Sequence, residues 1–331
     1  MVLRYHPVST PMAKLAIIGT GFVGTSLGLA LRPSKLFDQI AGADVDRGRA
    51  QAAKRAGAID EDVRSAADAV REASVVVLTV PGAELAPLLA DVASRLSAGA
   101  VVSDTSRWKA AALEAARELP PEVHFIGGRP VLDNAGHGPA EARADVFTNA
   151  VWCLTPGPYT DAAAIEAMSA VAHAAGSQEY FLSPDEHDAL SACGELLPPA
   201  ILATLALTIT RDAAWLDTGR LAGDTLHRLV VQAEALDASF WREASANAAP
   251  LSRWLDAAID QLGQLRERLA VEDAKQLHTS WQSTLDALGR WRRDKRALQE
   301  STMPPKEDMK PNLLGNIAAL NRLRGGQSDK R

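Results

Sequence analysis

Apolar runs alternate with helix-like stretches along the first half of the chain. The apolar runs lie at residues 15–18, 39–44, 73–80, 100–104, 123–126 and 150–154, and helix-like stretches at 25–31, 46–58, 84–96 and 107–118 follow the first four. Continuous β-branched runs are typical of strands buried on both faces. Strands that alternate with helices indicate a doubly wound parallel sheet. We therefore predict an α/β domain with a parallel sheet over residues 13–158.

The pattern becomes helical from about residue 160. Residues 189–213 form a long run rich in Ala and Leu. A seam then follows with apolar gaps of 4, 3, 4, 3 and 4 residues, made by Leu251, Leu255, Ala258, Leu262, Leu265 and Leu269. A second stripe is formed by Trp281, Leu285, Leu288 and Trp291. We predict an all-helical domain over 159–298, with an N-terminal extension (1–12) and a polar, proline-containing tail (299–331). The spacing fits packing within one chain and a dimer interface equally well.

Composition narrows the class of protein. The 331 residues are 47% hydrophobic and 23% charged, which is ordinary for a globular protein. The net charge of -6 argues against nucleic acid and anionic membranes as partners. We also expect no membrane span, because no apolar run approaches 18 residues. The two cysteines, Cys153 and Cys193, lack acids or histidines at metal-binding spacing, so free thiols, no metal and a cytoplasmic location are expected.

A glycine motif carries the clearest chemistry. Gly19, Gly21 and Gly24 follow the first apolar run and open a helix, and Asp44 comes about 20 residues later. In such a motif the glycines allow a tight turn, close approach of a pyrophosphate and close helix–strand packing. The helix N-terminus attracts the phosphates, and the acid binds a ribose hydroxyl and thereby favours NAD over NADP. The residues expected to bind the dinucleotide are Gly19, Thr20, Gly21, Phe22, Val23, Gly24, Asp44, Arg47, Val80, Pro81 and Asp104.

Several segments share a family's pattern: IIGTGFVGTSLGLAL at 17–31, AGAIDEDVRSAADAV at 56–70, VVVLTVP at 75–81, GAVVSDTSRWK at 99–109 and FIGGRP at 125–130. With these segments the chain resembles the prephenate and arogenate dehydrogenases of tyrosine biosynthesis, within the 6-phosphogluconate-dehydrogenase-like superfamily. The resemblance implies a Rossmann-type domain followed by an all-α dimerisation domain, and thus a homodimer. It further implies an NAD-dependent oxidoreductase, with NADP as a possible cofactor, that oxidatively decarboxylates a small anionic cyclohexadienyl substrate.

The residues that handle substrate depart from the family's pattern. Its Gly-Gly-His-Pro motif has Arg129 in place of the histidine, and its Asp-x-x-Ser-x-Lys motif has Arg107 in place of the serine but keeps Lys109. An arginine stays protonated at neutral pH and cannot act as a base. We expect the two arginines either to bind an anion or to face solvent or pair with acids such as Asp133 and Glu195, and Lys109 to line the site. His137, between two glycines, is the candidate proton acceptor, and His187 is expected to pair with the acid beside it.

Three functions therefore stay open on the sequence. The first is a dehydrogenase that acts on prephenate, arogenate or a close relative. The second keeps the fold and the cofactor but takes another small anion, gripped by the two arginines. The third is a member of the family that binds NAD without catalysing a reaction.

Overall fold

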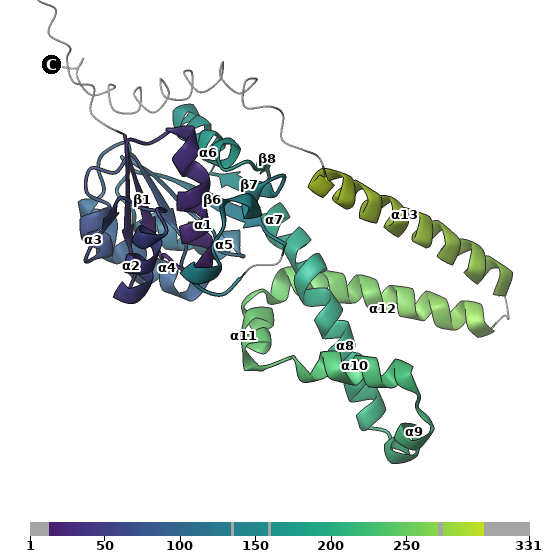
Figure 1. The fold of residues 1–331 in the computed structure, drawn as a ribbon. Coiled ribbons are helices and arrows are strands. Elements are labelled where there is room, and N and C mark those ends of the chain that lie inside the picture. The colour runs from purple at the N-terminus through teal and green to yellow at the C-terminus, as the bar shows by residue number, and fades with distance from the viewer. Residues whose placement is uncertain (1–12, 134–135, 158–159, 271–273, 301–331) are drawn as a thin grey trace, which may run out of the picture. The chain divides into compact units, whose positions relative to one another are not determined.

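The computed structural model describes residues 13–133, 136–157, 160–270 and 274–300 (Figure 1). Two units each make most of their contacts internally; the first takes in the described residues up to Pro184 together with 295–300, and the second spans Asp185–Asp294. The first contains a sheet with helices on both faces, whereas the described residues of the second form helices only. The fold class expected from the sequence, an α/β sheet domain followed by a helical domain, is confirmed.

Eight strands of the described chain form one sheet in the order β3-β2-β1-β4-β5-β6-β7-β8. Their bounds are β1 Lys14–Ile18, β2 Gln39–Ala43, β3 Glu61–Asp62, β4 Val75–Leu78, β5 Val101–Asp104, β6 His124–Val131, β7 Val151–Pro156 and β8 Gln178–Phe181. Neighbouring strands run parallel except β6 and β7, which are antiparallel. The expectation of a wholly parallel sheet is wrong at this pair. The described residues between these strands form only short 3₁₀ turns, whereas a parallel crossover needs a longer connection, usually a helix.

Helices cover both faces of the sheet. One face carries α1 (Phe22–Leu31), α2 (Arg47–Arg55) and α6 (Ala162–Ala174), and the other carries α3 (Ala66–Ala69), α4 (Leu85–Val92) and α5 (Lys109–Ala115). Short 3₁₀ turns lie at Arg32–Ser34, Gly82–Glu84, Ala93–Arg95 and Ala116–Glu118. Successive residues of β1 alternate between the two cores: Leu15 and Ile17 join one, and Ala16 and Ile18 the other. Burial on both faces explains why the strands read as continuous apolar runs.

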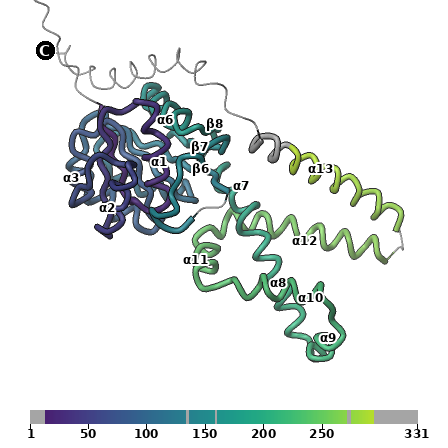
Figure 2. Tube along the Cα trace, in the orientation of Figure 1, coloured from purple at the N-terminus to yellow at the C-terminus, as the bar shows by residue number. Residues whose placement is uncertain are grey.

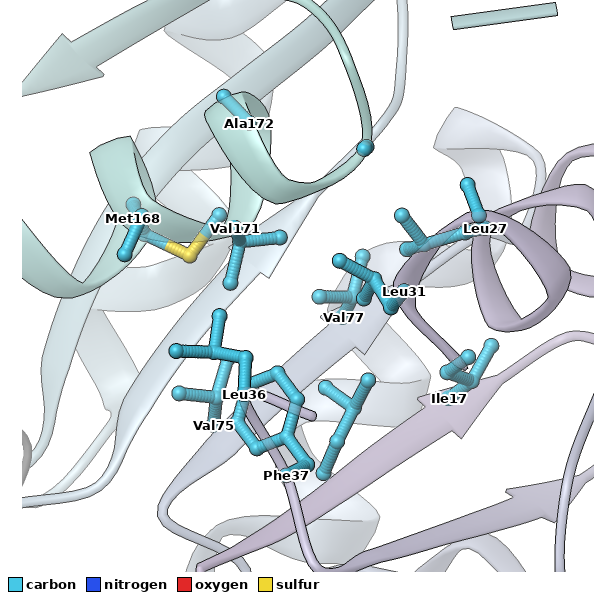
Figure 3. Close-up of a cluster of buried hydrophobic side chains, with 14 of the residues drawn as sticks. Ile17, Leu27, Leu31, Leu36, Phe37, Val75, Val77, Met168, Val171 and Ala172 are labelled. Atoms are coloured by element: carbon cyan, nitrogen blue, oxygen red, sulfur yellow. The ribbon is translucent and has the colours of Figure 1, made fainter. Parts of the chain in front are cut away.

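The core under α1 and α6 holds large aliphatic side chains (Figure 3). Leu27 and Leu31 of α1, Met168 and Val171 of α6, and Val75 and Val77 of β4 are each at most 1% exposed. Full burial of one such side chain contributes about 1.5–3 kcal/mol. These contacts hold α1 against the sheet, and so position the glycine loop from which α1 starts.

The sheet unit extends beyond the residue at which the sequence predicts the helical domain to begin. Both α6 and β8 lie after residue 158, and both belong to the sheet unit. The sequence does not predict strand β8, because it is short and polar at its start (QEYF). It pairs at the edge of the sheet, where its residues are half-buried or exposed. The described helical unit begins only at Asp185.

Helices of the second unit follow one another with short connections. Their bounds are α7 Pro184–Ser191, a π-helical turn at Ala192–Leu196, α8 Leu197–Thr210, α9 Trp215–Leu221, α10 Asp224–Glu234, α11 Ala238–Ala246, α12 Ala248–Ala270 and α13 Ala274–Glu300. Helix α10 runs beside α8 (Figure 2), and α12 packs against α8, α11 and the π-helical turn. The Trp254 indole N–H donates to the Ala189 carbonyl at 2.8 Å and ties α12 to α7.

The predicted seam on α12 divides into two halves. Leu251 is buried and Leu255 and Ala258 are half-buried, so this half packs inside the unit. In the second half, Leu262, Leu265 and Leu269 are 60%, 44% and 60% exposed. On α13 the stripe of Trp281, Leu285, Leu288 and Trp291 is likewise exposed. Packing within the chain thus accounts for only the first half of the seam.

One helical stretch, Pro184–Thr210, is long and apolar enough to cross a membrane by length and composition alone. The expectation that no such stretch exists is therefore wrong. Pro198 and Pro199 lie at the start of α8, directly after the π-helical turn at Ala192–Leu196, and the helix continues through them to Thr210. The same composition also suits a helix that packs against apolar protein surfaces.

Candidate dinucleotide and substrate site

The three glycines of the motif have distinct surroundings. Gly19 has a φ of +94°, and a Cβ there would lie 2.6 Å from the Thr79 carbonyl oxygen. A Cβ on Gly24 would overlap the Gly19 carbonyl, so this position brings α1 close to β1. A Cβ on Gly21 would meet nothing within 4 Å. The loop is therefore closed at its two ends and open in the middle, as an approaching pyrophosphate requires.

Helix α1 starts directly on this loop. Gly21 is the N-cap and has no side chain to satisfy the first turn, and the first helical bond runs from the Thr25 N–H to the Gly21 carbonyl. The backbone N–H groups of Phe22, Val23 and Gly24 therefore have no acceptor within the helix. Unpaired N–H groups and the positive end of the helix dipole favour an anion at this position.

Asp44 lies at the end of β2 and reaches the same loop. Its carboxylate accepts hydrogen bonds from the Thr20 N–H at 2.7 Å and the Asp46 N–H at 2.9 Å, and it is half-buried. Arg47 Nη2 lies 3.9 Å from Asp62, and Arg49 Nε lies 3.7 Å from Asp46. The structure thus gathers the predicted cofactor residues from Gly19 to Gly24 around Asp44, and each of the two nearby arginines has an acidic partner.

The end of β4 supplies a further contact that the sequence did not single out. The Thr79 N–H donates to the Ile18 carbonyl, and its hydroxyl donates to the Gly19 carbonyl. Thr79 therefore holds the glycine loop against β4, and the predicted residues Val80 and Pro81 follow it directly. The only local signal is a threonine at the end of an apolar run, just before Pro81.

A buried ion pair joins the end of β5 to α5. The side chains of Asp104 and Lys109 are both 0% exposed, and Lys109 Nζ lies 2.6 Å from Asp104 Oδ2. Lys109 also donates to the Gly128 carbonyl at 2.7 Å, while the Gly128 N–H donates to Asp104 Oδ1 at 3.0 Å. Ser106 donates to Asp104 from its backbone N–H, at 2.9 Å, and from its hydroxyl. The pair therefore fixes the β5–α5 turn to β6.

The two predicted arginines lie beside this network. Arg107 follows Ser106 and is exposed, and Arg129 follows Gly128 on β6 and is half-buried. Arg129 pairs in register with Cys153 of the antiparallel strand β7. Burial raises the pKa of the Cys153 thiol, and the charges of Arg129 and Lys109 partly oppose this rise. The guanidinium of Arg129 therefore lies near the Cys153 side chain.

His137 belongs to the loop between β6 and β7. Its backbone N–H donates to Glu141 at 3.0 Å, and a Cβ on Gly136 would lie 2.8 Å from the ring of Phe22, the first residue of α1. The Arg143 N–H donates to Ser26 of α1 at 3.1 Å. The loop that carries His137 is thus anchored on α1, close to the glycine loop, and the His137 side chain is exposed.

His187 lies in the helical unit. Its Nδ1 is 2.8 Å from Asp188 Oδ1, and both side chains are buried. The expected pairing with the adjacent acid is confirmed, and this pairing gives His187 a structural task within α7.

Known proteins similar to this chain share its architecture and sequence. Residues 27–180 match the profile of the nucleotide-binding domain of prephenate dehydrogenase. A solved structure of prephenate dehydrogenase from A. aeolicus, in complex with hydroxyphenyl propionate and NAD+, has a TM-score of 0.71. It is 22% identical, and the comparison covers 85% of this chain and 99% of that one. At this identity the match establishes the fold.

Sequence similarity extends into the helical unit. Prephenate dehydrogenase of Bacillus subtilis is 25% identical over 276 residues, which cover 82% of this chain and 74% of the relative. NovF of Streptomyces niveus, described as a probable prephenate dehydrogenase, is 30% identical over 268 residues, 78% of this chain and 69% of NovF. Together with the nucleotide-binding match, this similarity shows that the chain belongs to the prephenate dehydrogenase family of oxidoreductases.

Proposed function

We propose that the chain is an NAD-dependent dehydrogenase that oxidatively decarboxylates a cyclohexadienyl carboxylate, prephenate or arogenate. The observation that carries the proposal is the glycine loop, open at Gly21 and bounded by Asp44, in a member of a dehydrogenase family. When bound, NAD+ supplies the hydride acceptor. Loss of the ring carboxylate as carbon dioxide then leaves the aromatic product.

The residues present fit NAD. The open backbone at Gly21 and the N–H groups of α1 would hold the pyrophosphate, and Asp44 would accept hydrogen bonds from the adenine ribose. The Asp44 carboxylate also disfavours a 2′-phosphate, and Arg47 and Arg49 already face acidic partners. We therefore place NAD ahead of NADP. Replacement Asp44→Ser is expected to narrow the ratio of kcat/KM between NAD and NADP, and an unchanged ratio would contradict this role.

A proton acceptor for the substrate hydroxyl is needed as the carbinol carbon becomes carbonyl-like. Arg129 cannot take this part, because its guanidinium stays protonated. We assign it to His137, on the loop anchored beside the start of α1. We propose that Lys109 supports the site by donating a hydrogen bond to the Gly128 carbonyl, next to Arg129. Replacement His137→Gln is expected to lower kcat, because the substrate hydroxyl loses its proton acceptor; an unchanged kcat would exclude His137.

A spectrophotometric assay tests the proposed reaction. Purified protein is mixed with NAD and either prephenate or arogenate, and reduced nicotinamide is followed by its absorbance. Turnover of at least one substrate is expected, with carbon dioxide and the phenolic product formed in equal amounts. Protein that binds NAD in a calorimeter but turns over neither substrate would refute the proposal and favour a non-catalytic NAD-binding member of the family.

We also propose a homodimer formed through the helical unit. The exposed apolar side chains of α12 and α13, Leu262, Leu265, Leu269, Trp281 and Leu285 among them, and the apolar stretch Pro184–Thr210 support a protein partner. Contiguous exposed apolar surface marks an interaction site. We therefore expect a second copy to cover this surface in place of a membrane. Sedimentation equilibrium should give twice the chain mass; a monomer at micromolar concentration would contradict the dimer.

The cytoplasm is the compartment that we propose. Cys153 and Cys193 are both free thiols, the first buried and the second half-buried. Free cysteines persist in reducing compartments. Localisation of a tagged full-length chain by microscopy tests this placement, and export of the tagged chain from the cell would contradict it.

A further inference from the structure

Two arginines follow residues that are tied to the same buried carboxylate. Asp104 Oδ2 accepts the Ser106 N–H at 2.9 Å, and Asp104 Oδ1 accepts the Gly128 N–H at 3.0 Å. Arg107 is the next residue after Ser106, and Arg129 is the next residue after Gly128. The backbone next to each arginine is therefore held by the Asp104 carboxylate, although the two arginines come from different elements of the sheet unit.

Lys109 neutralises the charge of the Asp104 carboxylate. Its ammonium lies 2.6 Å from Asp104 Oδ2, and neither side chain is exposed. The buried pair is neutral as a whole, so it adds little net charge at the surface above it. Arg107 is exposed and Arg129 is half-buried, so both guanidiniums have a route to solvent.

We propose that Arg107 and Arg129 form a carboxylate subsite for the substrate, with Asp104 and Lys109 as its positioning pair; this inference rests on the proposed function. A guanidinium presents N–H groups in a planar fork that matches a carboxylate. Two forks whose backbones are held by one network lose little freedom when they bind the same anion, which raises the affinity they provide.

The subsite suits the carboxylate that stays in the product. Two cations on the ring carboxylate would stabilise the charge that must leave as carbon dioxide, and so would favour the ground state over the transition state. The side-chain carboxylate keeps its charge throughout the reaction. In prephenate this carboxylate belongs to a keto acid, whereas arogenate carries an ammonium beside it, which two guanidiniums repel. The subsite therefore favours prephenate over arogenate.

The test uses three variants and a matched control. Arg129→Gln and Arg107→Gln remove one guanidinium each, Arg129→Lys keeps the charge without the fork, and Arg117→Gln changes an exposed arginine of the same unit that pairs with Glu114. Hydroxyphenyl propionate carries a side-chain carboxylate but no ring carboxylate. Calorimetry with this ligand and NAD therefore measures binding without any contribution from the ring carboxylate. Kinetics with prephenate and arogenate measure the preference between the two substrates.

Each glutamine variant at the subsite is expected to weaken hydroxyphenyl propionate binding about 10- to 100-fold. Arg129→Lys should lie between Arg129→Gln and the unchanged protein, and Arg117→Gln should bind normally. The preference of kcat/KM for prephenate over arogenate should shrink in both glutamine variants. Arg107 is exposed, so Arg107→Gln keeps the test valid even where Arg129→Gln lowers the melting temperature.

The outcomes separate the subsite from the reaction. Arginine-dependent binding of hydroxyphenyl propionate without turnover would refute the proposed function and support the subsite. If the unchanged protein turns substrate over, and Arg107→Gln and Arg129→Gln behave like Arg117→Gln in both assays, the subsite is overturned and the proposed function stays intact. A preference of the unchanged protein for arogenate would also overturn it.

Discussion

The two units of this chain bury their apolar residues in different ways. In the sheet unit, Leu15 and Leu89 are 0% exposed, because helices cover both faces of the strands. In the helical unit, Leu262 and Trp281 remain 60% and 57% exposed, although they lie on well-formed amphipathic helices. The sheet unit therefore completes its core within one chain, whereas the described helices leave apolar faces exposed. This difference supports the proposal that the first unit holds the ligand and the second forms the dimer.

The largest expected effect lies inside the sheet unit, at the buried ion pair. Lys109→Met leaves the Asp104 carboxylate buried without its cation, which is expected to cost about 3–5 kcal/mol of unfolding free energy. Urea unfolding measures this loss. The matched control is Lys54→Met, which removes an exposed ammonium 3.1 Å from Asp62 and should shift the unfolding midpoint far less, because solvent screens that pair. Equal shifts would mean that Lys109 is not buried as described.

A matched pair of leucines compares the two units directly. Leu27→Ala in α1 removes a side chain that is 0% exposed and should cost about 2–5 kcal/mol. Leu262→Ala in α12 removes one that is 60% exposed and should cost under about 1 kcal/mol in dilute protein. Under the dimer proposal this second cost should grow with protein concentration, because the dimer buries Leu262. Costs that are equal in dilute protein would break the comparison.

Charge on the exposed seam tests what covers it. The double variant Leu262→Glu with Leu265→Glu places two carboxylates on the apolar half of α12 and should raise the dimer dissociation constant about 30-fold or more. Analytical ultracentrifugation measures the constant. Gln264→Glu adds charge at an exposed polar position of the same helix and serves as control. If the double variant stays as dimeric as the control, another surface forms the dimer.

Local patterns predicted much of the sheet unit. The strand, glycine turn and helix around Gly19–Gly24 follow from residues that are neighbours in sequence, and Asp44 falls at the end of β2 as its spacing indicates. Thr79 could not be found in this way, because it contacts Gly19 from a strand 60 residues away. A local pattern records propensity and periodicity, but it does not record which strands become neighbours.

The sequence also did not predict which charged side chains are buried. Lysine is almost never fully buried unless it is paired, so the sequence predicts that Lys109 lines the site. In the structure Lys109 is fully buried, because it pairs with Asp104. Strand β8 pairs at the edge of the sheet, and a short polar segment carries a weak signal for such pairing. The antiparallel direction of β7 is set by its connection to β6, which the apolar run of β7 does not record. On α12 the regular spacing of leucines predicted an apolar stripe correctly, but spacing has no information about which molecule covers it.

Acids in both units have a lowered pKa, Asp60 and Asp62 in the sheet unit and Asp237 in the helical unit. Burial acts to raise the pKa of Asp60, but the Ile40 N–H, at 2.8 Å, and the Arg32 guanidinium, at 2.6 Å, outweigh it, and the net pKa is below the ordinary value. In the helical unit, hydrogen bonds from Ser239 lower the pKa of Asp237, the N-cap of α11. In both cases the folded protein favours the charged carboxylate.

The smallest expected effect is a loss of stability in acid that can be traced to each unit. A carboxyl whose folded pKa is depressed stabilises the fold above its unfolded value, about 3.9, and this contribution is lost as pH falls through the lower folded pKa. For Asp60 the loss should stay under about 1 kcal/mol, because solvent reaches and screens its pair with Arg32. Asp60→Asn should flatten the acid dependence of the sheet unit and leave that of the helical unit unchanged, and Asp237→Asn should do the reverse. Amide hydrogen exchange between pH 3 and pH 6, read separately for the two units, measures both, and a variant that alters both units equally would show that they unfold as one body.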